Sequence, residues 1–352
     1  MKTIKKIFAL CLVVTLCINI IGCKKNNQPA ETDKNNKLTI MTTLYPYYDF
    51  VRAVVGNTPG IEVKLLIAPG KDDHSFEPTP KDIVAINKAD LFIYNGGSIE
   101  NWVEEITGSL DNDKQVRMRM MDYLDNNQLQ QKSNASANEE ADNNETERLF
   151  AVEDDDHHHE HEHGKDEHSE ETDEHLEETD EHIWTSPKYA TVLVEKISEK
   201  LCSLVPEYKK EFEKNSEDYI KQINKVDTRI RKIVDKSKNK EIIFADKFPL
   251  KYFAQEYGLK YYAAFPGCSG DTEPSAKTVA FLIDKVNANH VKGIFYLELS
   301  SRAMADVISE DTEAEVYQFN SCHNVTDRQF KKGVTYVQLM NENADVLEKA
   351  ID

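Results

Sequence analysis

The chain has 352 residues, of which 63 are acidic and 43 basic, giving a formal net charge of −20. Residues 139–181 contain 21 acidic side chains against Arg148 and Lys165 alone, so one segment accounts for nearly all of this charge. The remainder is close to neutral, which excludes the broad basic surface typical of nucleic-acid binding, and no nucleic-acid partner is expected.

The N-terminus has the pattern of a secretory signal. Lys2, Lys5 and Lys6 form a basic start, and the apolar run that follows covers residues 7–21, fewer than the roughly 20 that a spanning helix needs. The run ends at Gly22-Cys23, which resembles a bacterial lipobox whose cysteine is acylated. The alternative is an ordinary secretory signal followed by a coincidental cysteine.

We therefore expect a signal peptide over residues 1–22, acylation of Cys23 and a polar tether over residues 23–37. Acyl chains anchor a soluble domain durably when two or more are present. The protein is expected on the extracytoplasmic face of the cell membrane, held there by lipid.

Strand and helix signals alternate in the first half. Runs rich in β-formers cover residues 38–44, 62–67 and 90–94, and helical spacing covers residues 47–55. A further helix is expected to open at Thr79-Pro80, with threonine as N-cap and proline in the first helical position. This alternation predicts βαβ units and a parallel sheet.

Residues 126–181 show no periodicity and read as a disordered insertion rich in His, Asp and Glu. Seven of the eleven histidines of the chain lie here and an eighth, His182, follows directly, and short His-rich tracts are typical of metal binding. An acidic linker with chance histidines is the alternative. Seven of these histidines are expected to form an auxiliary, weak metal-binding loop: His157, His158, His159, His161, His163, His168 and His175.

The second half resumes the alternation after two helices, over residues 188–204 and 208–234. The second of these has about 28 residues and a length of some 40 Å. The strands and helices that follow are expected over residues 241–245, 259–263, 275–287, 292–297, 301–309, 315–319 and 335–350.

These elements predict an α/β fold, with two βα lobes that have parallel-type sheets and are joined by a single long rigid helix. The N-terminal lobe is expected over residues 38–187, the connecting helices over 188–238 and the C-terminal lobe over 239–352.

Three cysteines remain once Cys23 and the two in the signal are set aside. Cys268 and Cys322 both follow predicted strands, and an extracytoplasmic location permits a disulfide between them. Cys202 lies in a helical pattern and fits a buried apolar position. Three free thiols are the alternative.

Four potential metal ligands lie at strand ends or segment joints. His74 follows the second predicted strand, His182 ends the acidic segment, Asp246 ends a strand of the second half and His323 follows the last strand. Ligand sites of open α/β sheets form at the carboxyl ends of strands. Taken singly, each is more often an ordinary surface residue, but two from each half suit a metal site between the lobes.

At these residues the chain resembles the metal-type solute-binding lipoproteins of bacterial ABC importers, which bind zinc or manganese. The resemblance covers residues 38–351. It is carried by order and spacing in these stretches: Tyr45-Pro46-Tyr47-Tyr48-Asp49-Phe50, Pro69-Gly70 through His74 to Glu77-Pro78-Thr79-Pro80-Lys81-Asp82, residues 89–96, His182-Ile183-Trp184 with Pro187, Glu256-Tyr257-Gly258-Leu259 and Glu273-Pro274-Ser275.

The resemblance implies that His74 and His182 are the first two ligands. Zinc members have a histidine at the third position, where this chain has Asp246, and the fourth position falls near His323. Both placements carry a one-residue ambiguity, so Asp73 and Glu298 are reserve ligands. Three imidazoles and one carboxylate suit Zn²⁺, with Mn²⁺ as the alternative and copper or nickel also compatible.

The resemblance implies a function as an extracytoplasmic lipoprotein that captures Zn²⁺ between its lobes and delivers it to the permease of an ABC importer. We expect a monomer and no enzymatic activity. A zinc hydrolase is the weaker alternative because the sequence has no HExxH motif. A zinc-dependent surface adhesin or a zinc store is the other alternative.

Overall fold

Two parallel β-sheets organise this computed structural model, which describes residues 38–124, 180–265 and 274–352. The strand order is β2-β1-β3-β4 in the first sheet and β6-β5-β7-β8 in the second, so the two sheets have the same topology. All of the pairings between neighbouring strands are parallel. The strands are β1 (Leu38–Thr42), β2 (Ile61–Leu65), β3 (Leu91–Tyr94), β4 (Val116–Arg119), β5 (Glu241–Phe244), β6 (Lys260–Ala263), β7 (Gly293–Leu297) and β8 (Glu315–Phe319).

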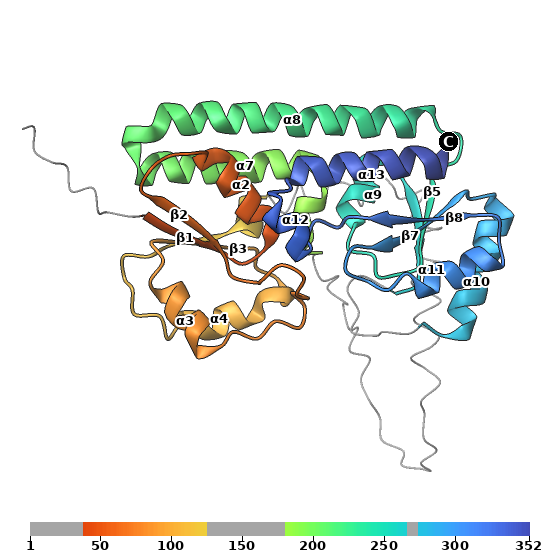
Figure 1. Cartoon of the computed structure of the whole chain (residues 1–352), viewed down its shortest axis with the longest axis horizontal. Helices are drawn as coiled ribbons and strands as arrows, with labels where there is room; N and C mark the ends of the chain where they lie inside the picture. The colour runs from red at the N-terminus through yellow and green to blue at the C-terminus, as the bar shows by residue number, and fades with distance from the viewer. Residues whose placement is uncertain (1–37, 125–179, 266–273) are drawn as a thin grey trace, which may run out of the picture. The chain divides into compact units, whose positions relative to one another are not determined.

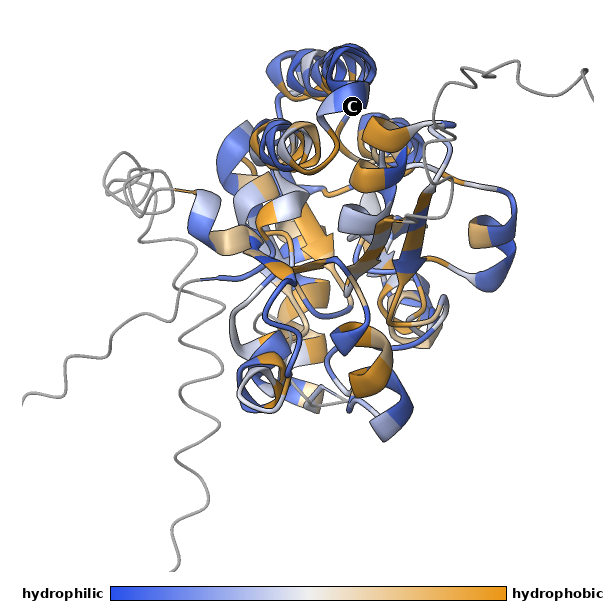
Figure 2. Ribbon diagram, turned by 90° about the vertical axis from the view of Figure 1, so that its left-hand side faces the viewer, coloured by the Kyte–Doolittle hydropathy of each residue, from blue (hydrophilic) through white to orange (hydrophobic). Residues whose placement is uncertain are grey.

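Helices cover both faces of each sheet, as buried parallel strands require. On one side, a single large apolar cluster joins both sheets to α2 (Tyr45–Val55), α7 (Pro187–Leu204), α8 (Lys209–Lys236) and α13 (Tyr336–Ile351) (Figure 1). Smaller apolar clusters lie on the opposite faces. They pack the first sheet against α3 (Pro80–Asn87) and α4 (Asn101–Thr107), and the second against α10 (Ala276–Asn289) and α11 (Ala303–Glu310). Figure 2 shows apolar residues along the interior strands and polar residues on the outer helix faces.

Helix α8 is the longest of the described elements, with 28 residues and a length of about 42 Å. Its buried residues recur at helical intervals and pack against α7, α13 and α2. They are Phe212, Ser216, Tyr219, Ile223, Val226, Ile230, Ile233 and Val234. Because α8 runs beside helices that contact both sheets, it ties the two halves into one apolar core (Figure 1).

The fold class predicted from the sequence is confirmed, and each predicted strand and helix is present with ends that agree within two residues. Four elements had no counterpart in the prediction: β4, α4, α9 (Lys251–Tyr257) and α12 (Asp327–Lys331). Within the described residues, no helix combines the length and the apolar character that crossing a bilayer requires.

Several predictions concern residues outside the described ranges and stay predictions: the signal peptide, Cys23, the tether and the seven histidines of the acidic segment. Cys322 is a free thiol among the described residues, with 1% exposure. Because Cys268 itself lies outside the described residues, its predicted disulfide with Cys322 also stays a prediction. Cys202 is a free, half-buried thiol.

Candidate metal centre

Three histidines from distant parts of the sequence meet between the two sheets. His74 lies in the loop from β2 to α3, His182 directly precedes the short helical turn η5 (Ile183–Thr185), and His323 lies between β8 and α12. One ring nitrogen from each lies within 4.8 Å of the other two. The ring centroids are 5.9 Å apart for His74 and His182, 5.0 Å for His74 and His323, and 4.9 Å for His182 and His323.

This spacing is close to that of a bound zinc ion. With Zn–N distances of about 2.0–2.1 Å, the nitrogens of a tetrahedral site lie about 3.4 Å apart. The largest separation here is at most 4.8 Å, so movements of about an ångström by side chains suffice to close the site.

Three buried polar atoms at the centre have no hydrogen-bond partner among the described residues. They are Nε2 of His74, Nε2 of His323 and Oδ2 of Asp73. An unsatisfied buried polar atom costs about 1–3 kcal/mol, so three in one place need an explanation. His323 Nε2 lies 3.0 Å from Asp73 Oδ2, yet the contact lacks hydrogen-bond geometry. These two ring nitrogens and the carboxylate oxygen carry lone pairs and lie close together, as the ligands of a metal cation do.

The ring of His182 is oriented by a carboxylate. Nδ1 of His182 lies 3.0 Å from Oδ1 of Asp180, and the backbone N–H of His182 donates to the same oxygen at 2.9 Å. This contact leaves Nε2 to face the other histidines, in the carboxylate–histidine arrangement common behind metal ligands. Burial alone would raise the pKa of Asp180, but the contacts with His182 outweigh it and lower that pKa. The hydroxyl of Tyr252 donates to the carbonyl of Asp180 at 2.7 Å, which fixes this segment to α9.

His323 is held through Ser321 and Trp184. Glu298 accepts from the backbone N–H of Ser321 at 2.6 Å and from its hydroxyl at 2.7 Å. The hydroxyl oxygen of Ser321 accepts from the N–H of His323 at 3.3 Å, and its carbonyl accepts from the indole N–H of Trp184 at 3.0 Å. Cys322, between them, has a positive φ of 61°, a conformation that costs energy for a residue other than glycine. The backbone before His323 is therefore rigidly placed.

The electrostatics keep the imidazole of His74 ready to bind a cation. Burial, together with the neighbouring His323, lowers the pKa of His74 to about 4, so this ring is neutral near pH 7. Burial alone would raise the pKa of Asp73, but the nearby His323 outweighs it and lowers that pKa. A neutral imidazole beside an ionised carboxylate is the protonation state that a metal ligand needs.

The structure does not place the fourth predicted ligand, Asp246, with the three histidines. One carboxylate oxygen of Asp246 accepts from the N–H of Leu297 at 3.0 Å and the other from the N–H of Lys247 at 2.8 Å. Asp246 thus joins the ends of β5 and β7 and has its oxygens engaged. The oxygens of Glu298 are likewise engaged by Ser321. Of the two reserve ligands, only Asp73 contacts a histidine of the cluster.

Asp180 and Glu100 were not predicted from the sequence to belong to the site. Asp180 was one of many acids in the segment, although its place two residues before His182 could have marked it as an orienting carboxylate. Glu100 is 1% exposed, and burial raises its pKa to about 7. It accepts from the N–H of Gly96 at 2.8 Å. No local pattern in the sequence distinguishes it.

A cavity of about 240 Å³ connects the cluster to the surface. Asp73, His74 and His323 line it, together with Lys71 and Lys247. The site is therefore reachable by a hydrated cation without unfolding of either half.

Comparison with known proteins gives concordant results. A family described as "Zinc-uptake complex component A periplasmic" matches residues 40–350. The high-affinity zinc uptake system protein ZnuA of Bacillus subtilis is 30% identical over 348 residues, covering 99% of this chain and 98% of that protein. The zinc-binding lipoprotein AdcA of Streptococcus pneumoniae is 29% identical over 342 residues, and the chain spans 60% of its length. The Zn(II)-bound ZnuA-like domain of AdcA is similar in structure, with a TM-score of 0.65, 28% identity and coverage of 90% of this chain and 99% of that one.

Proposed function

This chain belongs to the family of zinc-uptake components to which ZnuA gives its name, and from that premise we propose that it captures Zn²⁺ for import. The observation that carries the proposal is the convergence of His74, His182 and His323, one ring nitrogen from each lying within 4.8 Å of the others. Metal capture in a cavity between two parallel sheets needs no chemical step, so the protein acts as a binding protein and not as an enzyme.

Asp73 is the fourth ligand in this proposal. Its Oδ2 is buried, has no hydrogen-bond partner among the described residues and lies 3.0 Å from Nε2 of His323. Ligand atoms that share a tetrahedral zinc ion lie at similar separations. The site then consists of three imidazoles and one carboxylate, which leaves no open position for a catalytic water.

This donor set favours zinc over manganese. Imidazole nitrogen suits Zn²⁺, whereas Mn²⁺ prefers oxygen ligands and a higher coordination number. Two described carboxylates contact the imidazole rings, and of these Asp73 is available as a ligand, because Asp180 is engaged by Nδ1 and the backbone N–H of His182. The oxygens of Asp246 and Glu298 are engaged elsewhere.

The partner in this proposal is the permease of an ABC importer, which receives the ion when the site opens. The N-terminal signal and Cys23 support anchoring by lipid on the extracytoplasmic face, where the acidic segment gathers cations weakly beside His182. The chain acts there as a monomer.

Zinc titration of the chain lacking residues 126–178 tests the proposal. The expected result is one tight zinc site per chain with the segment removed and further weak sites in the full chain. In the shortened chain, His74→Ala, His182→Ala and His323→Ala should each weaken the tight site by at least a hundredfold. Tight binding that survives all three substitutions would refute the assignment.

A further inference from the structure

The outer face of α8 carries a stripe of lysines far from the metal centre. Lys221, Lys225, Lys232 and Lys236 recur at spacings of four, seven and four residues, which places them on one side of the helix. All four are exposed, and they line a groove of about 710 Å³ beside α13 together with Arg229 and Glu348. We call these four residues the basic stripe.

Three of these lysines have no acidic partner in the part of the chain that the structure describes. Within the described residues no carboxylate lies within 4.0 Å of Lys225, Lys232 or Lys236, whereas Lys221 pairs with Asp218 at 3.1 Å. The first half of the same helix differs, because Lys209 pairs with Glu213 at 3.6 Å and Lys214 with Asp218 at 2.8 Å. The unpaired positive charge is therefore concentrated in the second half of α8.

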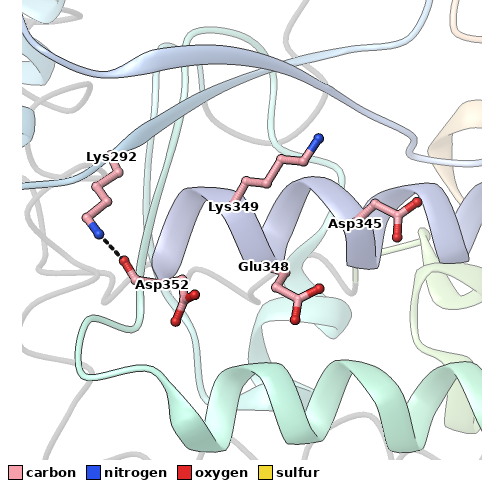
Figure 3. A pocket seen from close by; sticks show the side chains of 5 residues that line it. All are labelled: Lys292, Asp345, Glu348, Lys349 and Asp352. Atoms are coloured by element: carbon pink, nitrogen blue, oxygen red, sulfur yellow. Dashed lines mark hydrogen bonds between the residues drawn. The ribbon is translucent and has the colours of Figure 1, made fainter.

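The acidic residues of the neighbouring helix α13 are engaged elsewhere. Arg229 binds Asp345 at 2.5 Å and lies 3.7 Å from Glu348. Figure 3 shows these two acids in the adjoining pocket, where Lys292 donates to the carbonyl of Asp352. The acids of α13 thus neutralise Arg229 and leave the basic stripe as a local excess of positive charge.

We propose that the basic stripe rests on an anionic lipid bilayer. The inference builds on the proposed location at the membrane surface. Helix α8 is an outer layer, since α7 and α13 lie between it and the sheets, so its face can meet a flat surface (Figures 1 and 2). Each lysine near an anionic membrane strengthens binding by about fivefold, so three unpaired lysines supply about a hundredfold.

The position of the acidic segment supports the same orientation. Its described end, Asp180, is bound to His182 and to Tyr252 of α9 and has no described contact with the basic stripe. Anionic lipid repels a segment with a net charge of −19 and attracts the stripe. Both forces favour contact of the bilayer with the basic stripe over contact with the acidic segment. A tether of about 15 residues reaches at most about 50 Å, which keeps the folded unit close to the surface.

Lysine labelling tests the proposal on the full chain reconstituted with vesicles. The vesicles contain phosphatidylcholine alone or phosphatidylcholine mixed with phosphatidylglycerol, and acylation by an amine-reactive reagent is followed by mass spectrometry at each lysine. We expect labelling of Lys225, Lys232 and Lys236 to slow by at least about threefold with phosphatidylglycerol, and the effect to vanish in about 1 M salt. Lys209 and Lys214 are internal controls on the same helix and should label equally in both vesicles.

Two charge-matched variants complete the test. In a chain that carries Cys23→Ser, so that no acyl anchor holds it to the vesicle, the triple variant Lys225→Ser, Lys232→Ser and Lys236→Ser should lower sedimentation with the anionic vesicles by at least about tenfold. Its control, with Lys209, Lys210 and Lys214 each replaced by serine, should change it by less than about threefold. The proposal that a bilayer contacts the basic stripe would be overturned if the lysines were labelled equally in both kinds of vesicle, or if the two variants lost sedimentation equally. It would also be overturned if the lysines bound soluble polyphosphate and the chain did not bind vesicles.

Zinc titration of the same preparations separates this inference from the proposed function. Both triple variants should bind zinc as the unaltered chain does. Absence of zinc binding by the unaltered chain would overturn the proposed function, whereas unchanged lysine labelling would overturn only the membrane contact.

Discussion

Replacing Asp73 by asparagine tests the fourth ligand without changing the size of the side chain. A negative charge about 2.1 Å from a divalent cation contributes about 4 kcal/mol even in the dielectric of bulk water, or about a thousandfold in affinity. The amide oxygen of the variant remains a weak donor and recovers part of this loss. We therefore expect Asp73→Asn to weaken zinc binding by about 100- to 1000-fold.

The assay is competition for zinc with a chromogenic chelator, performed on the chain lacking residues 126–178 so that only the tight site reports. Asp246→Asn is the matched control, because it removes one negative charge from a buried strand end whose oxygens accept from Lys247 and Leu297. We expect the control to change zinc affinity by less than about threefold. An equal loss in the two variants, or a larger loss for Asp246→Asn, would refute the assignment of Asp73.

Further predictions concern the surroundings of the site. Asp180→Asn should weaken zinc binding by about 10- to 100-fold in the same competition assay, since it releases the ring of His182; unchanged affinity would show that Asp180 does not orient that ring. Zinc held by the acidic segment should be lost below about pH 6.5, where free histidines take up protons, whereas the central site should persist to about pH 5 because the pKa of His74 is about 4. Measuring bound zinc against pH, in the chain with and without residues 126–178, checks this prediction. Loss of zinc from the acidic segment and from the central site over the same pH range would contradict it. The metal-free protein should lose stability as the pH falls from about 6.5 to about 4, since over that window the unfolded chain binds a proton at His74 that the folded chain excludes. Thermal unfolding measured against pH should show this loss of stability, and the loss should be smaller in His74→Asn. A loss of the same size in His74→Asn would show that other titratable groups cause it. Trp184→Phe should lower the free energy of unfolding by about 1–3 kcal/mol in urea by leaving the carbonyl of Ser321 unpaired, and an unchanged value would show that the bond contributes little.

Much of the fold was predictable because strand and helix periods follow one another regularly along the chain. Thr79 and Pro80 mark the start of α3 through capping chemistry that depends on neighbouring residues alone. Strand β4 was missed because its four residues, VRMR, are too few for the alternation of apolar residues and arginine to stand out. The short helices α4 and α9 have too few turns for a periodic pattern to stand out.

The candidate site was predictable in part for the same reason. His74 and His323 follow strands, and ligand sites of open sheets form at the carboxyl ends of strands, so both could be predicted as ligands. The choice between Asp73 and Asp246 depended on contacts that local sequence does not encode. Asp246 is engaged by the N–H of Leu297, 51 positions away, a bond set by the pairing of β5 with β7. Asp73 was overlooked as the main carboxylate because only the folded loop shows it facing His323.

X-ray absorption at the zinc edge, on the chain lacking residues 126–178 and loaded with one zinc ion, tests the central claim most directly. We expect three imidazole nitrogens at about 2.0–2.1 Å and one carboxylate oxygen at about 2.0–2.2 Å. A first shell containing sulfur, or one with fewer than three imidazoles, would contradict the convergence of His74, His182 and His323 on a single ion.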